Sequence, residues 1–295
     1  MVYGITGNTK KEKVWVPVAE LARWLLMEKI PFSLNHDLAD VLSDRGLLPE
    51  DACRSHSTRE LAKDSDIILS FGGDGTLLLS AHEVGKHETP ILGVNIGRLG
   101  FLADIELGQL RSTISALEKG DYRIEERMLL TADVEEPEIT RRYWALNEFV
   151  LLRSGSAGLI SIRVTVDGIH LNDYWADGLI FSTPTGSTAY SMSVGGPIVA
   201  PNSDVFILTP LAPHSLTVRP VILPASSILE AQVLRDEEPY VLAYDGRSRV
   251  FEHGTEPMTF RFSRADHVVK LVKLPEQHYF QTLRSKLMWG VLRHG

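Results

Sequence analysis

Short apolar runs alternate with longer helical patterns over the first 120 residues of the chain. The runs contain little polar alternation, which is typical of strands covered on both faces. Between them, apolar residues recur every three or four positions, which is typical of amphipathic helices. This order predicts a parallel sheet wrapped by helices. We expect strands at residues 2–6, 66–71 and 90–96, and helices at residues 14–25, 76–83 and 107–117.

From about Arg127 the pattern changes to short β-type runs separated by turn residues. Residues 160–166 alternate strictly between apolar and polar before Asp167–Gly168, which predicts a hairpin. The number of such runs indicates a two-sheet sandwich or an open barrel. We expect strands at residues 128–134, 143–152, 160–166, 205–209, 216–223, 228–234, 240–244 and 258–262.

The end of the chain is helical in pattern. Phe280, Leu283, Leu287 and Val291 fall on one stripe, which leaves Arg284, Lys286 and Arg293 for solvent. The sequence therefore predicts an α/β N-terminal domain with a parallel Rossmann-like sheet at residues 1–126, a mostly-β, sandwich-like domain at 127–275, and a C-terminal helix at 276–295.

Composition and charge exclude several classes of protein. The 295 residues are 44% apolar and 23% charged, as in ordinary folded chains. Thirty Lys and Arg against 38 Asp and Glu give a net charge of −8, which argues against a broad nucleic-acid surface. No apolar run approaches the ~20 residues of a membrane helix. Cys53 is the only cysteine, which excludes an intramolecular disulfide and favours a reducing compartment, so we expect a cytoplasmic protein.

The sharpest motif is the run Gly72-Gly73-Asp74-Gly75-Thr76, between a predicted buried strand and a predicted helix. The glycines leave backbone amides open to an anion, while Asp74 lies at the end of the strand, where α/β sheets bind ligands. A hairpin turn is the alternative, but residues 76–81 do not alternate as a returning strand should. We therefore predict a phosphate-binding loop.

Other catalytic motifs are absent from the sequence. There is no Gly-x-x-x-x-Gly-Lys-Ser/Thr, no Gly-x-Gly-x-x-Gly after the first strand, no Gly-x-Ser-x-Gly and no His-Glu-x-x-His. P-loop enzymes, dinucleotide-dependent oxidoreductases, serine hydrolases and zinc peptidases are therefore poorly supported. A phosphoryl-transfer enzyme remains consistent with the glycine-rich loop.

A second cluster spans residues 177–197 and is rich in Ser, Thr and Gly. Hydroxyl groups and backbone groups that no large side chain covers can form hydrogen bonds with the polar edges of a nucleotide. The Tyr190 ring could stack on a base. A mobile surface loop is the alternative.

A third candidate is the pair Asn147–Glu148, inside an otherwise apolar run. Adjacent residues of a strand face opposite sides, so one of the two should turn inward or line a cleft. The amide and the carboxylate could form hydrogen bonds with adenine or with a ribose hydroxyl. Exposure to solvent at a sheet edge would explain two polar residues at this place equally well.

Together these clusters resemble the NAD kinase family. The motifs that carry the resemblance are GGDGT, residues 90–102, the Asn147–Glu148 pair and residues 177–197, in the family's order and over most of the chain. The resemblance implies an N-terminal α/β domain, a β-rich C-terminal domain whose last helix returns to the first, and a site in the cleft between them. It also implies a homodimer or homotetramer.

The resemblance further implies a reaction and roles for residues. The family transfers the terminal phosphoryl group of ATP to the 2′-hydroxyl of the adenosine ribose of NAD, giving NADP. Asp74 matches the general base, and Mg²⁺ or another divalent cation is expected, with ligands that the sequence does not identify. By resemblance, the phosphate-binding residues are Gly72, Gly73, Gly75 and Thr76, and the NAD-binding residues are Asp74, Gly75, Asn147, Glu148, Asp177, Thr185, Thr188, Ala189, Tyr190, Ser193 and Asp245.

Some positions and alternatives stay open. Asp245-Gly246-Arg247 resembles a late family segment that approaches NAD, but an ordinary β-turn explains it nearly as well. Trp175 stands where many members have a basic residue, which suggests altered discrimination between NAD and NADH. A kinase for another hydroxyl acceptor and a non-catalytic dinucleotide-binding regulator are the competing functions. The sequence leaves open whether ATP or inorganic polyphosphate is the donor, and what regulates the enzyme.

Overall fold

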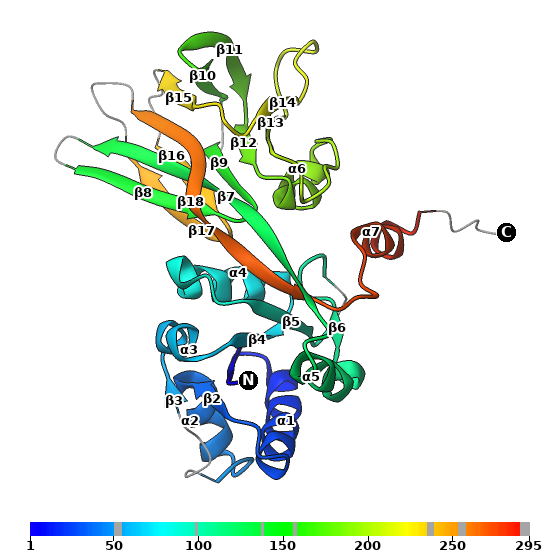
Figure 1. The fold of residues 1–295 in the computed structure, drawn as a ribbon. Coiled ribbons are helices and arrows are strands. Elements are labelled where there is room, and N and C mark those ends of the chain that lie inside the picture. Colours follow the sequence, from blue (N-terminus) through cyan, green and yellow to red (C-terminus); the bar gives the residue numbers. More distant parts are fainter. Residues whose placement is uncertain are drawn as a thin grey trace, which may run out of the picture. The chain divides into compact units, whose positions relative to one another are not determined.

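The chain folds into two compact units, each described here by itself (Figure 1). The computed structural model describes residues 1–49, 55–97, 100–136, 139–155, 158–234, 239–252 and 258–289. The first unit comprises Met1–Glu126 and Val269–Gly295, and the second Arg127–Val268. The chain crosses between the units within β7 (Arg123–Glu136) and β18 (Thr259–Lys273). The second crossing precedes the expected boundary at residue 275, because the end of β18 pairs with the first unit's sheet through Leu271 and Ile91.

The first unit is built on a parallel sheet with the strand order β5-β4-β1-β2-β3. All six residues of the central strand β4 are buried. Leu69 and Phe71 join the apolar core on one face, while the hydroxyl of Ser70 meets that of Ser80 in α4 on the other, 2.8 Å away. The strands are β1 (Tyr3–Gly7), β2 (Phe32–Asn35), β3 (Ser55–His56), β4 (Ile67–Gly72), β5 (Ile91–Asn95) and β6 (Ile105–Glu106), which pairs with β5.

The helices of this unit follow local signals in the sequence. Ser57 and Glu60 form a reciprocal capping box at the start of α3, and Gly85 caps the end of α4. The predicted helices are confirmed, except that Val14 lies in a 3-10 turn before α1 and Leu107–Gln109 form a 3-10 turn before α5. The α-helices are α1 (Trp15–Met27), α2 (His36–Asp44), α3 (Thr58–Asp64), α4 (Asp74–Val84), α5 (Leu110–Glu118) and α7 (Tyr279–Leu287); Val291 and Arg293 of the predicted last helix lie outside the described residues.

The second unit packs two antiparallel sheets on one apolar core. One sheet has the order β14-β13-β12-β9-β16-β17, and the other runs β11-β10-β15-β18 with β7 and β8 attached. The ring of Phe181 from the first sheet stacks on that of Phe262 from the second, with centroids 4.0 Å apart. The strands are β8 (Ile139–Ala145), β9 (Glu148–Arg153), β10 (Ile160–Val166), β11 (Ile169–Ala176), β12 (Gly178–Ser182), β13 (Val205–Leu211), β14 (Val221–Pro224), β15 (Leu229–Leu234), β16 (Tyr240–Tyr244) and β17 (Arg247–Phe251).

Two predicted strands of this unit are corrected by the structure. The run 143–152 is two strands, β8 and β9, because the chain bends at Leu146–Asn147. The run 216–223 becomes a strand only from Val221, since Pro220 precedes it and Leu216 is 89% exposed. In the part of the chain that the structure describes, no helix has the length and apolar character needed to cross a membrane.

Candidate active site

The glycine-rich motif forms a tight connection between β4 and α4. Gly72 ends the strand and Asp74 begins the helix, with Gly73 as its N-cap. A side chain at position 72 would overlap that of Thr76, so the turn can be this tight only with glycine. The predicted order of strand, glycine turn and helix is therefore confirmed, and Asp74 lies at the positive end of α4.

The carboxylate of Asp74 is held by three backbone N–H groups. Phe101 donates to Oδ2 at 2.8 Å, while Leu102 and Ala103 both donate to Oδ1 at 3.0 Å. A carboxylate has about four acceptor positions, two on each oxygen. Among the described residues, Oδ2 accepts only this one bond, so it keeps a position for a further donor. Arg98 and Leu99, just before this segment, lie outside the described residues.

A hollow of about 570 Å³ opens beside the glycine turn, where β4 and β5 end. Gly72, Gly73 and Gly97 line it with backbone atoms. Lys11 and Lys13, which are exposed residues of the connection between β1 and α1, also line it. Sequence reasoning missed these lysines, because a lysine in a loop carries no signal of its own. The lining residues are Lys11, Glu12, Lys13, Gly72, Gly73, Asn95, Ile96 and Gly97.

In the second unit, Asp245 fixes the bend that carries Asn147. Its carboxylate accepts the N–H of Leu146 at 2.6 Å and that of Asn147 at 2.9 Å. Asp245 itself lies in the turn after β16 with a φ of 44°. From the other side, the N–H of Thr183 donates to the Asn147 carbonyl at 2.9 Å. The predicted residues Asn147 and Asp245 are therefore brought together, and the turn alternative for Asp245 is also correct.

Glu148, the first residue of β9, has an unusual environment. Burial, and to a lesser degree the nearby charge of Asp245, raise its pKa to about 8, and the backbone of Tyr190 opposes this shift. Its Oε2 atom is buried and has no hydrogen-bond partner among the described residues, and the same holds for Oγ1 of Thr185. Buried polar atoms are normally paired, so these two are open to polar groups of a ligand.

The serine- and threonine-rich segment is compact. It forms a 3-10 turn at Thr185–Thr188 and the short helix α6 (Tyr190–Ser193). The hydroxyl of Ser187 bonds to both backbone groups of Val199, and that of Ser191 lies 3.0 Å from the hydroxyl of Thr209. These buried contacts contradict the alternative of a plain surface loop. Thr188, Ala189 and Ser193 lie on this framework, and the Tyr190 side chain is 40% exposed.

Asp177 lies apart from this cluster. It precedes β12, whereas the serine-rich segment follows β12, and the five-residue strand separates them by roughly 16 Å at about 3.3 Å per residue. Its Oδ1 accepts from Nε of Arg153 at 3.3 Å. Two residues before it, Trp175 is 61% exposed and its ring meets that of His214 edge-on at 6.0 Å.

The fold and the site define a class of protein. The first unit has a carboxylate fixed at a glycine turn, beside a hollow lined by lysines. The second unit has buried polar atoms that lack hydrogen-bond partners. These features indicate a phosphotransferase that acts on an alcohol group. Comparisons with known proteins agree. The ATP-NAD kinase N-terminal domain matches residues 4–122, and the ATP-NAD kinase C-terminal domain matches residues 146–274.

Individual relatives match most or nearly all of the chain. The NAD kinase of Cytophaga hutchinsonii is 36% identical over 291 residues, 99% of each chain, and that of Bacteroides fragilis is 44% identical over 227 residues, 77% of each. The chain belongs to the ATP-NAD kinase family. It is an enzyme that transfers the γ-phosphoryl group of ATP to the 2′-hydroxyl of the adenosine ribose of NAD.

Solved structures show the same fold. Yeast NADH kinase complexed with NADH has a TM-score of 0.88 at 23% identity and covers 99% of this chain and 89% of its own. An NAD kinase from Archaeoglobus fulgidus in complex with ATP has a TM-score of 0.74 at 24% identity and covers 98% of this chain and 99% of its own. The predicted fold class and the predicted family are thus confirmed.

Proposed function

We propose that Asp74 is the general base of this kinase. The observation that carries the proposal is the fixed carboxylate at the glycine turn, with one acceptor position left on Oδ2. An aspartate carboxylate is ionised at neutral pH. It can accept the proton of the 2′-hydroxyl as the oxygen bonds to phosphorus.

The phosphates of the donor bind in the lysine-lined hollow. Gly72, Gly73, Gly75 and Thr76 surround the start of α4, where backbone N–H groups and the helix dipole favour an anion. Lys11 and Lys13, which also line the hollow, add positive charge. Phosphoryl transfer depends mainly on such positioning and charge stabilisation.

A divalent cation, Mg²⁺ in the first instance, accompanies the donor. The described residues contain no group of three or more His, Cys, Asp or Glu side chains arranged to hold a metal ion. Mg²⁺ keeps several waters and is held largely by substrate phosphates, so it needs few protein ligands. Glu12 and Asn95 carry the side-chain oxygens that line the hollow, so they are the groups that could coordinate it. When bound, the ion neutralises charge on the phosphate oxygens.

The second unit binds NAD. Asn147 and Glu148 hold the adenosine part, where Oε2 of Glu148 and Oγ1 of Thr185 are unpaired. Tyr190 packs on a ring, and Asp245 acts by fixing the Asn147 bend. Residues 188–193 line the dinucleotide site, and Asp177 and Ala189 lie near the nicotinamide carboxamide. Asp177 precedes β12 and Ala189 follows it, so this pairing requires the chain after β12 to fold back toward Asp177.

The protein acts as a homodimer or homotetramer in the cytoplasm. Ile169 and Trp175 are large, exposed apolar residues of β11, which forms the edge of its sheet, and exposed apolar edges favour an interface between copies. The single cysteine, Cys53, fits a reducing compartment.

The proposed roles are tested first by product formation. Purified protein is incubated with NAD, ATP and Mg²⁺, and the product is measured with an NADP-specific dehydrogenase. We expect NADP to form, and its formation to stop when EDTA removes the cation and to resume when Mg²⁺ is restored. Turnover that persists in EDTA would contradict the role of the cation, and a product phosphorylated elsewhere would contradict the placement of NAD.

A further inference from the structure

The segment that holds Asp74 is itself held by a buried lysine. Nζ of Lys273 donates to Oδ2 of Asp104 at 2.7 Å and to the carbonyl oxygen of Leu102 at 3.4 Å. The side chains of Lys273 and Asp104 are both more than 90% buried. All of these residues belong to the first unit, although 171 positions of sequence separate Lys273 from Leu102.

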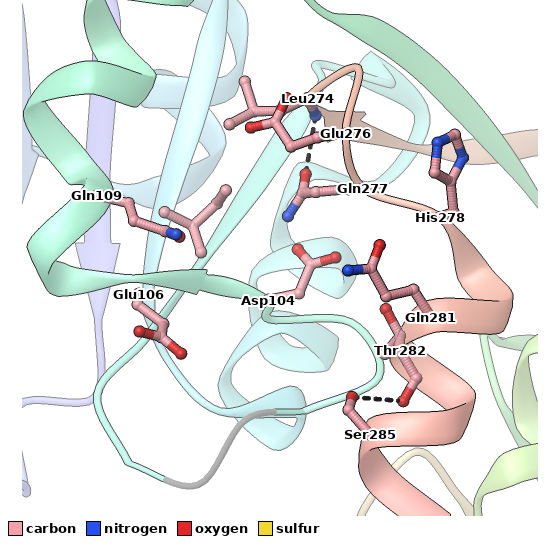
Figure 2. A pocket seen from close by; sticks show the side chains of 11 residues that line it. Asp104, Glu106, Gln109, Leu274, Glu276, Gln277, His278, Gln281, Thr282 and Ser285 are labelled. Atoms are coloured by element: carbon pink, nitrogen blue, oxygen red, sulfur yellow. Dashed lines mark hydrogen bonds between the residues drawn. The ribbon is translucent and has the colours of Figure 1, made fainter. Parts of the chain in front are cut away.

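The residues on either side of Lys273 fix its position at the end of β18. Val272 and Leu274 belong to the apolar core of the first unit, so the lysine side chain between them points the other way. The N–H of Leu274 donates to the side chain of Gln277 at 2.8 Å. Figure 2 shows Asp104, Leu274 and Gln277 around one polar hollow of about 310 Å³. The ammonium group therefore reaches Asp104 from a well-supported strand end.

One peptide group links Lys273 to the carboxylate of Asp74. The carbonyl oxygen of Leu102 and the N–H of Ala103 belong to the same peptide group. The oxygen accepts from Lys273, and the N–H donates to Oδ1 of Asp74 at 3.0 Å. Hydrogen bonds in such a chain polarise and strengthen one another. The N–H of Gly100 donates to the Ala103 carbonyl at 3.1 Å, which closes the turn that contains this peptide group.

Stability alone does not explain a buried ion pair at this place. The cost of removing two charges from water can exceed what their attraction returns, and two apolar side chains often fill such a place with no loss of stability. An apolar pair, however, could not donate to the Leu102 carbonyl or tie residue 104 to β18. The ion pair of Lys273 and Asp104 supplies both connections.

We propose that Lys273 is a positioning residue of this kinase. Together with Asp104 it fixes residues 101–104, so that the N–H groups of residues 101–103 keep the carboxylate of Asp74 in the orientation that accepts the proton of the substrate hydroxyl. The proposal rests on the proposed role of Asp74 as the base. Loss of Lys273 should lower kcat more than it changes either KM, because a displacement near 1 Å at a reacting group costs about 100-fold in rate.

The test separates positioning from stability. Lys273→Met leaves Asp104 buried without its partner, so it should lower the thermal midpoint by about 5 °C or more. Lys273→Met/Asp104→Leu removes both charges and should recover most of the midpoint. We expect the kcat of this double variant to stay about 10- to 100-fold below that of the wild type, with the KM for NAD and for ATP within about 3-fold. Lys270→Met is the control, because Lys270 lies on the same strand but pairs with Glu88 at 2.9 Å.

A milder variant serves if the double variant does not fold. Asp104→Asn keeps an acceptor oxygen for Lys273 but weakens the bond by removing the charge, so it should lower kcat by about 3- to 10-fold. All rates are measured well below the lowest thermal midpoint. A kcat within about 2-fold of the wild type in the double variant, or in Asp104→Asn where the double variant does not fold, would overturn the role of Lys273.

A second comparison shows whether Lys273 acts through Asp74. In an Asp74→Asn background the same changes should lower the rate of NADP formation by less than about 2-fold, since the group that Lys273 positions is gone. A loss as large as in the protein with Asp74 would show a general structural role and overturn the proposal. Asp74→Asn alone tests the proposed base: if it keeps full turnover, that base is wrong, whatever Lys273 does.

Discussion

Gly100 lies directly against the carboxylate of Asp74, so that a Cβ atom at position 100 would overlap Oδ1. The carboxylate and the segment that holds it thus fit together only when residue 100 has no side chain. We expect Gly100→Ala to displace one of the two and to lower kcat by about 100-fold, the cost of a displacement near 1 Å at a reacting group. Gly108→Ala is the control, because a Cβ there meets nothing within 4 Å. Equal activity of the two variants would contradict the account.

Glu148 makes stability depend on pH. Its pKa is raised from 4.5 to about 8 by burial and by Asp245, so between these values the native state binds the proton more tightly than the unfolded chain. Stability is therefore lost as the pH rises through this window and levels off above about 8. The side chain of Glu148→Gln needs no proton. We therefore expect the difference in thermal midpoint, Glu148→Gln minus wild type, to increase by at least about 3 °C from pH 5 to pH 9. The exposed Glu252→Gln should show no such trend, and a gap that stays constant with pH would contradict the assignment.

Lys11 and Lys13 should determine the affinity for the phosphate donor. They line the hollow beside the glycine turn, where their charges meet those of the phosphates. We expect the double variant Lys11→Gln/Lys13→Gln to raise the KM for ATP by about 10-fold or more, with the KM for NAD little changed, since each charge-assisted contact is worth about 1.5 kcal/mol. Lys10→Gln is the matched control, because Lys10 is outside the residues that line the hollow. A larger change in the KM for NAD than for ATP would place the donor elsewhere.

Trp175 should influence the choice between NAD and NADH. The residue is exposed two positions before Asp177, and the oxidised nicotinamide ring is positively charged whereas the reduced ring is neutral. A positive charge introduced here would repel the oxidised form more. We expect Trp175→Arg to lower the NAD:NADH ratio of kcat/KM by about 3- to 10-fold, and Trp175→Leu, which changes size without charge, to leave that ratio nearer the wild type. An unchanged ratio in Trp175→Arg would discard the hypothesis.

The sequence predicts those parts of the molecule that local patterns determine. Fully buried strands such as β4 appear as apolar runs, and the glycine turn is marked by residue types that few other structures require. The resemblance identifies the residues that lie around Asn147, but it does not predict the hydrogen bonds between them.

Contacts made by backbone groups were beyond prediction. The three N–H groups that hold Asp74 belong to Phe101, Leu102 and Ala103, whose side chains say nothing about a bond to a carboxylate. The bend at Leu146–Asn147 likewise depends on Asp245, about a hundred residues away, so the sequence pattern alone predicts one strand there. The stripe of α7 predicts that Lys286 lies in solvent, whereas its side chain is partly buried, because the pattern of one helix does not show what packs beside it.

The central claim is that Asp74 accepts the proton of the hydroxyl that is phosphorylated. The most direct measurement is single-turnover NADP formation by wild type and Asp74→Asn, with NAD binding measured by calorimetry on both. The amide has nearly the same size but cannot take up the proton, and its NH2 group gives up at least the bond from the Phe101 N–H. Calorimetry shows whether the NAD site survives this loss, and the account predicts a rate at least about 1,000-fold lower with NAD affinity within about 3-fold. A variant that binds NAD and still forms NADP within about 10-fold of the wild-type rate would contradict it.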